Sequence, residues 1–517
     1  MSESRENDQL VQRRNNLTEI TKLGVPIYPG AFRCTGSVLE IVTEHSETDG
    51  NTLDSDHVNL ATAGRILIVR NFGKARFLVI SDGLSRLQIY LRKDSLCERD
   101  FAIASLLDVG DFIGLEGRLF RTRTDELTVW VSRLEFLAKC TLPLPEKWHG
   151  LTDIETRHRQ RYLDLIVNPV SRSVFETRAR ILREIRRFFV DRKFLEVETP
   201  MMQPVAGGAL ARPFVTHHNA QDMELYLRIA PELYLKRLVV GGVERVFEIN
   251  RNFRNEGISK QHNPEFTMLE FYQAYSDYRE LMAMTEDLLA TVAREAVGSE
   301  EVTYAGETLS FRPPYRRVAL RQAVCEAATK KLGKEVSEDE LRARSTVALL
   351  AERLGLEPSE SQGPGKITVE IFEHLCEPTF IQPTFVHDFP TEVSPLSKQM
   401  KNDPDTVERF ELFVAGMELA NAFSELNDPV DQKLRFQEQL RNRQGGDLEA
   451  HQMDHDYIRA LEYGLPPTAG EGVGIDRLVM VMTNSPSIRD VILFPLMRSK
   501  REDSEVGTNP ASEGRDD

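Results

Sequence analysis

The residues best suited to chemistry lie in one stretch, 247–275, which reads FEINRNFRNEGISKQHNPEFTMLEFYQAY. Two alternating runs flank a polar connection that contains a glycine, a pattern that predicts two antiparallel strands joined by a long loop. Side chains two apart on a strand share a face, which would place Asn250, Arg254 and Glu256 together. An arginine fork bonds two phosphate oxygens at once. The first run therefore predicts a phosphate-binding surface.

The second run would present Phe266, Glu270 and Tyr272 on one face. The rings offer a surface for stacking, and the carboxylate suits a cationic or metal-bound ligand. The competing interpretation is an ordinary solvated sheet face with incidental charges. Aromatic residues among the charges argue against it.

FRNEG at 253–257, followed by HNPEFTMLEFYQAY, resembles the second signature motif of the class II aminoacyl-tRNA synthetases. Residue by residue, the sequence is similar to the bacterial lysyl-tRNA synthetase branch over roughly residues 55–498. The family's first motif reads FETRARILREIRRFFVDRKFLEVETPMM at 175–202, and its third reads GEGVGIDRLVMVM at 470–482. The resemblance implies an enzyme that activates L-lysine with ATP to lysyl-adenylate, releases pyrophosphate and transfers lysine to the 3′ end of tRNA(Lys).

The composition agrees with such an enzyme but is less specific. A chain of 517 residues, 41% of them hydrophobic, can form two or more domains. It has no apolar run long enough to span a membrane and no signal peptide, and its five scattered cysteines are typical of reduced thiols in a cytoplasmic chain. A net charge of -16 argues against a surface built for nonspecific polyanion binding.

The elements that must position these residues fall into several segments. Residues 1–56 predict a helical extension followed by a loop at 43–57, and residues 57–140 contain five short alternating strands. Such strands predict a five-stranded OB-fold barrel. The proline-rich segment 141–165 is interpreted as a linker. The remaining fold class is α+β, with a catalytic domain on an antiparallel sheet flanked by helices at 166–499 and a disordered tail at 500–517.

OB barrels bind single strands through aromatic stacking beside basic groups. Phe77 and Gln88 lie on adjacent candidate strands with arginines close in sequence. The resemblance implies that this barrel reads the tRNA anticodon, with Phe77, Gln88 and Glu126 stacking on or bonding its bases. The alternative is that Phe77 simply belongs to the barrel core.

The first motif predicts an amphipathic helix over 176–195, followed by a strand toward Pro200. Alone, this helix is only a surface helix with a basic outer face. The resemblance implies that it forms a homodimer interface with Pro200 at its centre.

The segment FELFVAGMELANAFSELND at 410–428 predicts a hairpin that turns at Ala415-Gly416 and brings Glu411 and Glu418 onto one face. Two carboxylates beside phosphates suit Mg²⁺, and the resemblance implies Mg²⁺ at these positions. Asn421, Phe423 and Glu425 are an odd number of residues away from Glu418, so in a regular strand they would point to the opposite face. A bulge or strand end is therefore expected between them if all contact one ligand. The resemblance implies that these three residues contact lysine.

Two further positions are implied in lysine binding. Adjacent glycines permit close approach of a ligand to Gly208, and Glu232, in an apolar setting, needs a partner. Three departures from the family pattern lie nearby, and the last two predict altered substrate affinity; they are Leu210 for threonine, Met417 for arginine and Ala422 for glycine.

The charge of this pocket favours lysine as the substrate. Glu232, Glu270 and Glu425 present negative charge, and Tyr272 and Phe423 offer aromatic walls. An ammonium on a four-carbon stem matches both. The related aspartyl and asparaginyl branches are disfavoured by the sign of the charge.

The third motif lacks the dinucleotide fingerprint and instead leads into a helix that would begin near Asp476, where the helix dipole favours phosphate. The resemblance implies catalytic roles for Arg254 on the α-phosphate and Arg477 on the γ-phosphate of ATP. It also implies that Phe266 stacks on adenine. The other residues implied in holding the nucleotide are Glu256, His262, Asn263 and Glu411.

Three alternatives stay open. One is a ligase that lysylates a protein, although such relatives lack the barrel. Another is an aspartyl- or asparaginyl-type synthetase. The third is a non-enzymatic tRNA-binding or regulatory protein, against which the retained Arg254, Glu411 and Arg477 argue.

Overall fold

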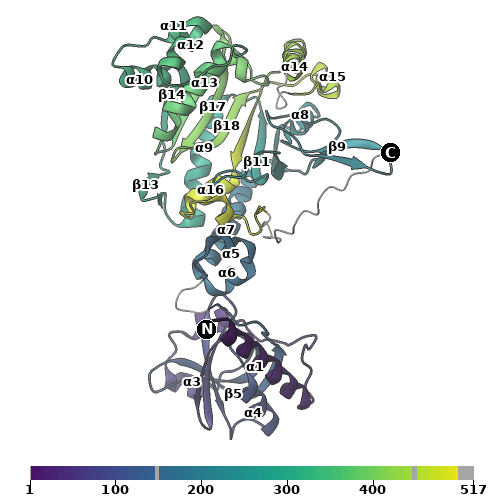
Figure 1. The fold of residues 1–517 in the computed structure, drawn as a ribbon, viewed down its shortest axis with the longest axis vertical. Helices are drawn as coiled ribbons and strands as arrows, with labels where there is room; N and C mark the ends of the chain where they lie inside the picture. The colour runs from purple at the N-terminus through teal and green to yellow at the C-terminus, as the bar shows by residue number, and fades with distance from the viewer. Residues whose placement is uncertain (1, 146–150, 445–450, 499–517) are drawn as a thin grey trace, which may run out of the picture. The chain divides into compact units, whose positions relative to one another are not determined.

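The computed structural model describes residues 2–145, 151–444 and 451–498 (Figure 1). The chain divides into two compact units, Met1–Val170 and Ser171–Asp517. The expected tail at 500–517 lies outside the described residues, as do residues 146–150 of the expected linker. The domain limits drawn from the sequence stay predictions.

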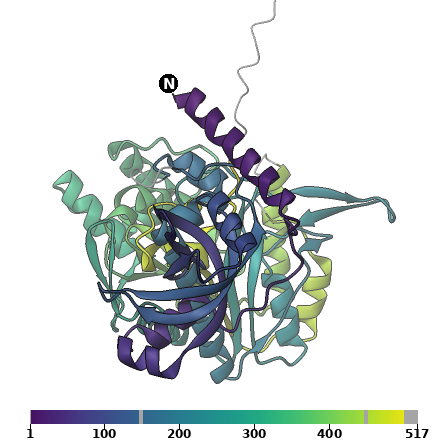
Figure 2. The ribbon, with the colours of Figure 1, turned by 90° about the horizontal axis from the view of Figure 1, so that it is seen from below.

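The first unit contains the expected barrel. Its described residues form five strands that close in the order β1-β2-β3-β5-β4, and Figure 2 shows them curving around one another in purple and blue. Alternate side chains point inward, and Leu78, Ile89 and Val129 are fully buried. The OB-type barrel is confirmed. Its strands are β1 (Asn59–Phe72), β2 (Ala75–Ser81), β3 (Arg86–Arg92), β4 (Phe112–Arg121) and β5 (Leu127–Ala138).

Helices replace two of the expected irregular segments. The predicted loop at 43–57 is wrong, because the Asp49 carboxylate accepts hydrogen bonds from Asn51 N and Thr52 N, at 2.9 and 3.1 Å, and caps a helix. The described part of the expected linker also forms two helices, the first capped by Asp153. The helices of this unit are α1 (Ser2–Lys22), α2 (Val38–His45), α3 (Gly50–Asp56), α4 (Glu98–Leu106), α5 (Ile154–Arg159) and α6 (Arg161–Val167).

The second unit is built on one large sheet. Its described residues give nine strands, of which eight follow the order β14-β15-β17-β18-β19-β11-β10-β6, with β16 paired to β17. The pairing is antiparallel except at β14-β15 and β10-β6. The strands are β6 (Leu195–Glu196), β10 (Arg245–Phe253), β11 (Glu265–Ala274), β14 (Arg316–Ala319), β15 (Thr384–Pro390), β16 (Gln399–Met400), β17 (Asp403–Val414), β18 (Met417–Ser424) and β19 (Thr468–Gly474).

Helices cover one face of this sheet and leave the other available for a site. Leu269 and Phe271 of β11 pack into a core with residues of α7 (Pro169–Asp191), α9 (Tyr278–Val292) and α16 (Ile475–Met482). Because neighbours on a strand point to opposite faces, Glu270 and Tyr272 face away from those helices. The predicted α+β class, with an antiparallel sheet flanked by helices, is confirmed.

The first motif forms α7, which ends at Asp191, while the expected strand after it is only the two residues of β6. A helical group packs beside β15 and β17 and comprises α10 (Leu320–Leu332), α11 (Glu338–Arg342), α12 (Arg344–Arg353) and α13 (Pro364–Leu375). Smaller elements are β7 (Met202–Gln203), β8 (Val215–His218), β9 (Met223–Leu227), α8 (Glu232–Val240), β12 (Glu301–Tyr304), β13 (Glu307–Ser310), α14 (Pro429–Gln444), α15 (His455–Glu462) and α17 (Ile488–Val491). Within the described ranges, no helix combines the length and the apolar character needed to cross a membrane.

Candidate active site

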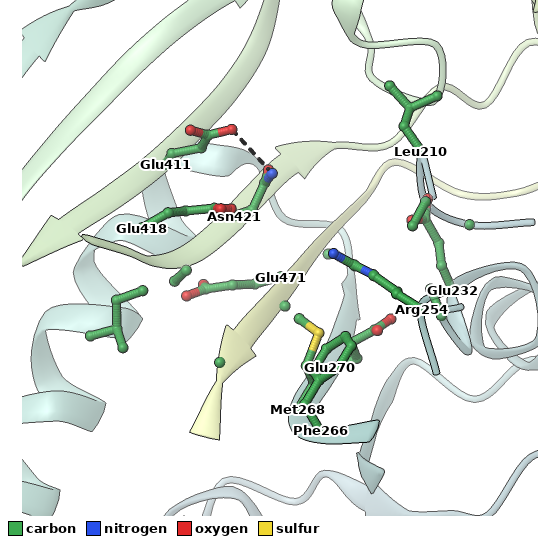
Figure 3. Close-up of a pocket in the computed structure, with 18 of the residues that line it drawn as sticks. Leu210, Glu232, Arg254, Phe266, Met268, Glu270, Glu411, Glu418, Asn421 and Glu471 are labelled. Atoms are coloured by element: carbon green, nitrogen blue, oxygen red, sulfur yellow. Dashed lines mark hydrogen bonds between the residues drawn. The ribbon is translucent and has the colours of Figure 1, made fainter. Parts of the chain in front are cut away.

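Figure 3 shows a cavity of about 370 Å³. It lies on the face of the sheet opposite α7 and α9, because it is lined by the β11 residues that alternate with those packed against these helices. Its lining comes from β11, β17, β18, β19, the segment between β10 and β11, the start of α8 and the start of α16. This volume lies in the range of small-molecule sites. The cavity therefore gathers the second and third motifs and the 410–428 segment, whereas no residue of the first motif lines it.

The segment after β10 carries the cationic group expected for phosphate. β10 ends at Phe253, so Arg254 and Glu256 follow the strand. Asn250 pairs with Met268, which lines the cavity, so the Asn250 side chain lies on the predicted face of the sheet. Asn250 is buried and donates to Glu248 O, at 3.2 Å. Arg254 and Glu256 nevertheless line the cavity.

The Arg254 side chain extends over the sheet toward the middle of the cavity (Figure 3). Its guanidinium carbon lies 5.1 Å from the centre of the Phe266 ring, a cation–π contact. Its Nε atom is buried and has no hydrogen-bond partner in the described part of the chain. This unsatisfied donor makes Arg254 ready to bind an anion.

β11 presents the expected alternation to the cavity. Phe266, Met268, Glu270 and Tyr272 all line it, which confirms the predicted face. The Tyr272 hydroxyl lies 3.5 Å from Glu270 Oε2. Burial, followed by the nearby charge of Glu232, raises the pKa of Glu270 to about 8. A cation placed against Glu270 would lower this pKa again and hold the carboxylate in its charged form.

A buried lysine that sequence analysis missed lies behind Glu232, which lines the cavity. Lys236 Nζ lies 2.5 Å from Glu232 Oε1 and also contacts the Glu425 carboxylate. Glu232 thus has the partner that its apolar setting required. Burial alone would lower the pKa of Lys236, but Glu232 and Glu425 raise it, so the ammonium stays charged. The signal was present in the sequence, because residues four apart on a helix face each other.

This lysine changes the electrostatics expected of the pocket. The Lys236 ammonium lies 5.3 Å from the centre of the Phe423 ring, which lines the cavity. Two of the three predicted carboxylates, Glu232 and Glu425, share its positive charge. The third carboxylate, Glu270, differs from these two. Among the described residues its hydrogen-bond partners are Asn252 and Tyr272, and neither is a cation.

The β17–β18 hairpin turns at Ala415 and Gly416, whose φ angles are 52° and 69°, as predicted. The register between the two strands shifts between Leu412 and Phe413, and this irregularity is the expected bulge. It allows Glu411 and Glu418 to line the same cavity.

Glu411 is held by its neighbours. It accepts a hydrogen bond from Arg409 Nη2, at 2.5 Å. It accepts another from Asn421 Nδ2, at 3.3 Å, which Figure 3 shows as a dashed line. Burial raises the pKa of Glu411 to about 8, Arg409 opposes this, and Glu418 adds to it. Arg409 also lines the cavity and was missed, although it lies two residues before Glu411 on the same strand.

The third motif forms the opposite wall. α16 begins at Ile475, next to the predicted Asp476. Arg477 Nη1 donates to Glu418 O, at 2.5 Å, and Arg477 Nη2 lies 3.2 Å from His262 Nε2. Burial, together with the charge of Arg477, lowers the pKa of His262. Asn263, next to it in sequence, also lines the cavity.

The departures from the family pattern fall in different places. Met417 and Ala422 are buried in the core on the helix-covered face and do not line the cavity, whereas Leu210 does. Gly208 has a φ of 89°, and a Cβ there would lie 2.9 Å from the Glu232 Cβ. A side chain at position 208 would therefore displace Glu232.

The remaining predicted residues lie outside the cavity. In the first unit, Phe77 is half-buried on the outer barrel surface, so the core interpretation is wrong; Gln88 Nε2 donates to Thr128 Oγ1, at 3.0 Å, and Glu126 is exposed. In the second unit, Pro200 is exposed.

Comparison with known proteins agrees with this geometry. Residues 153–498 match the family described as tRNA synthetases class II (D, K and N), and residues 61–137 match the OB-fold nucleic acid binding domain. The lysine–tRNA ligase of Carboxydothermus hydrogenoformans is 52% identical over 501 residues, which cover 96% of this chain and 100% of that protein. The enzyme of the same name from Moorella thermoacetica is 52% identical over 497 residues (96% and 99%), and that from Coxiella burnetii is 50% identical over 495 (96% and 98%).

Proposed function

Because the chain belongs to the class II tRNA synthetases of the D, K and N group, we propose that it is a lysine–tRNA ligase. It activates L-lysine with ATP, releases pyrophosphate and transfers lysine to the 3′ end of tRNA(Lys). The observation that carries this proposal is one cavity that holds a buried acid, Glu270, together with two cationic groups, Arg254 and Arg477. The acid is matched to the lysine ammonium and the cations to the triphosphate.

The lysine end of the cavity uses a small set of groups. Glu270 and the Tyr272 hydroxyl receive the side-chain ammonium, because a charged carboxylate beside a hydroxyl forms charge-assisted hydrogen bonds with it. Phe423 packs against the carbon stem. Gly208, Glu232 and Asn421 complete the pocket lining, and Glu425 lies behind it against Lys236.

The ATP end uses the arginines. The lysine carboxylate attacks the α-phosphorus in line while Arg254 stabilises the charge on the α-phosphate and Arg477 that on the γ-phosphate. The geometry requires no protein nucleophile, since the reaction rests on positioning and electrostatics. Glu256, His262, Asn263 and Phe266 hold the nucleotide. The adenylate is then attacked by the terminal ribose hydroxyl of tRNA.

Glu411 and Glu418 fit a divalent cation. They converge from neighbouring strands (Figure 3), and their like charges help to raise the pKa of Glu411, which a cation between them would reverse. Both offer the oxygen ligands that Mg²⁺ takes. Mg²⁺ bound there would neutralise phosphate charge.

The barrel supports recognition of the anticodon through Phe77, Gln88 and Glu126. Large apolar side chains around Pro200 support a homodimer, because Leu195, Met201 and Met202 are 54%, 49% and 55% exposed. The cytoplasmic location stays a prediction.

An aminoacylation assay, which measures the transfer of labelled lysine to tRNA(Lys), tests the proposal. Purified protein with ATP, Mg²⁺ and labelled lysine is expected to acylate tRNA(Lys) and to leave a protein acceptor unlabelled. Labelling of the protein acceptor alone would favour the protein-lysylating alternative. Binding of tRNA without adenylate formation would favour the non-enzymatic one.

A further inference from the structure

The outer surface of the barrel carries aromatic residues beyond Phe77. Strand register places one residue from each of four strands in a row, since Phe77 pairs with Tyr90, Tyr90 with Trp130, and Trp130 with Arg118. On the other side, Phe77 pairs with Arg70. The row faces outward, because the residues that follow Phe77 and precede Tyr90 and Trp130 along the chain are fully buried in the barrel.

The rings in this row contact one another. The Phe77 and Tyr90 centroids lie 4.7 Å apart with an interplanar angle of 29°, and those of Tyr90 and Trp130 lie 5.3 Å apart at 89°. Phe120, from the next row, lies 5.6 Å from Trp130. All four rings remain partly exposed. Rings that served only the barrel core would point inward.

Positive charge borders the same rings. The guanidinium carbon of Arg118 lies 5.2 Å from the Trp130 ring centre and that of Arg92 lies 5.9 Å from it. Their side chains are 37% and 45% exposed, and each also pairs with an exposed carboxylate, Asp54 or Asp94. Such exposed ion pairs are weak, so a phosphate can compete for both arginines. Rings flanked by arginines match the stacking and charge pattern of single-stranded nucleic acid.

We propose that Tyr90 and Trp130 within this row form a second stacking position. It holds a nucleotide of the anticodon loop next to the base that stacks on Phe77. Arg92 and Arg118 bind the phosphate beside that nucleotide. This inference rests on the proposed function, since it takes tRNA as the occupant. Stacking is tolerant of base identity, so this position adds affinity rather than sequence selectivity.

Fluorescence offers a direct test, because the chain contains two tryptophans, Trp130 and Trp148. In a Trp148→Phe background, Trp130 is the only tryptophan. Titration with tRNA(Lys) is expected to quench its emission, because the base stacks on the indole. Emission that stays unchanged at saturating tRNA would overturn the proposal, and this readout needs no variant at position 130.

Charging kinetics supply the second test. Trp130→Ala is expected to raise the KM for tRNA at least about tenfold, and Trp130→Phe to restore most of the loss. Tyr28→Ala, which removes an aromatic residue 65% exposed elsewhere in the same unit, is the matched control. Equal KM values for Trp130→Ala and Tyr28→Ala would overturn the proposal. Lysine-dependent pyrophosphate exchange, measured on the wild-type protein, separates the two hypotheses, because its absence refutes the proposed function itself.

Discussion

Lys236 lies one helical turn after Glu232, with its Nζ 2.5 Å from Glu232 Oε1, and the same ammonium also contacts Glu425. A lysine therefore already lies behind the lining of the proposed lysine pocket. This internal cation neutralises part of the acidic lining, and under the proposed function it leaves Glu270 to meet the substrate. Selectivity for the substrate then depends on where the negative charge lies, not only on its amount.

Replacing the internal cation should destabilise the fold. Lys236→Met leaves Glu232 and Glu425 buried without their cation, and we expect the free energy of unfolding to fall by about 3–5 kcal/mol. Chemical denaturation measures this change. The double variant Glu232→Gln/Lys236→Met should recover part of the loss, and a single variant as stable as the wild type would contradict the assigned ion pairs.

Glu270 should control lysine binding. Glu270→Gln removes the charged partner of the substrate ammonium, and we expect the KM for lysine in pyrophosphate exchange to rise about 10- to 100-fold. The KM for ATP should change little. Glu256→Gln, on the nucleotide side of the same cavity, is the matched control and should show the reverse pattern. A lysine KM unchanged by Glu270→Gln would place the ammonium elsewhere.

The elevated pKa of Glu270, about 8 in the free protein, predicts a pH dependence. The lysine ammonium binds the ionised carboxylate, so below pH 8 a proton must first leave. The KM for lysine should therefore fall as pH rises from 6 to 8, by up to about tenfold per pH unit. Exchange kinetics across this range test it, and Glu270→Gln should flatten the profile.

Glu471 should affect stability rather than chemistry. Its carboxylate is 2% exposed and accepts from Thr285 Oγ1 at 2.7 and 2.8 Å, and burial raises its pKa to about 8. Because the folded pKa exceeds the ordinary value of 4.5, its stabilising contribution is complete below pH 4.5. It is lost as pH rises toward 8, at about 1.4 kcal/mol per unit.

Unfolding measured across that range should therefore show a shallower decline in Glu471→Gln than in the wild type. Glu307→Gln, at an exposed strand position, provides the control. Parallel curves for the wild type and Glu471→Gln would contradict a protonated acid at this position.

The sequence was sufficient for features that depend on local alternation. The barrel strands, the shared face of Phe266, Glu270 and Tyr272, and the bulge between Glu418 and Ala420 all follow from the period of a strand. Contacts between segments that are distant in the sequence could not be predicted from this alternation. The pairing of Lys236 with Glu425 joins α8 to the end of β18, and no local pattern indicates it.

Other differences have local causes. Asp49 caps a helix where a polar stretch suggested a loop. Met417 and Ala422 belong to the core on the covered face, a placement that depends on the register shift in the hairpin. Their effect on lysine affinity is expected to be small, because neither lines the cavity.

Pyrophosphate exchange with each of the twenty amino acids tests the central claim most directly. The wild-type protein with ATP and Mg²⁺ is expected to exchange label with lysine alone, and Arg254→Ala is expected to abolish that exchange, because the variant lacks the cation that stabilises the α-phosphate. Exchange driven by aspartate or asparagine, or near-normal lysine-dependent exchange in Arg254→Ala, would contradict the account.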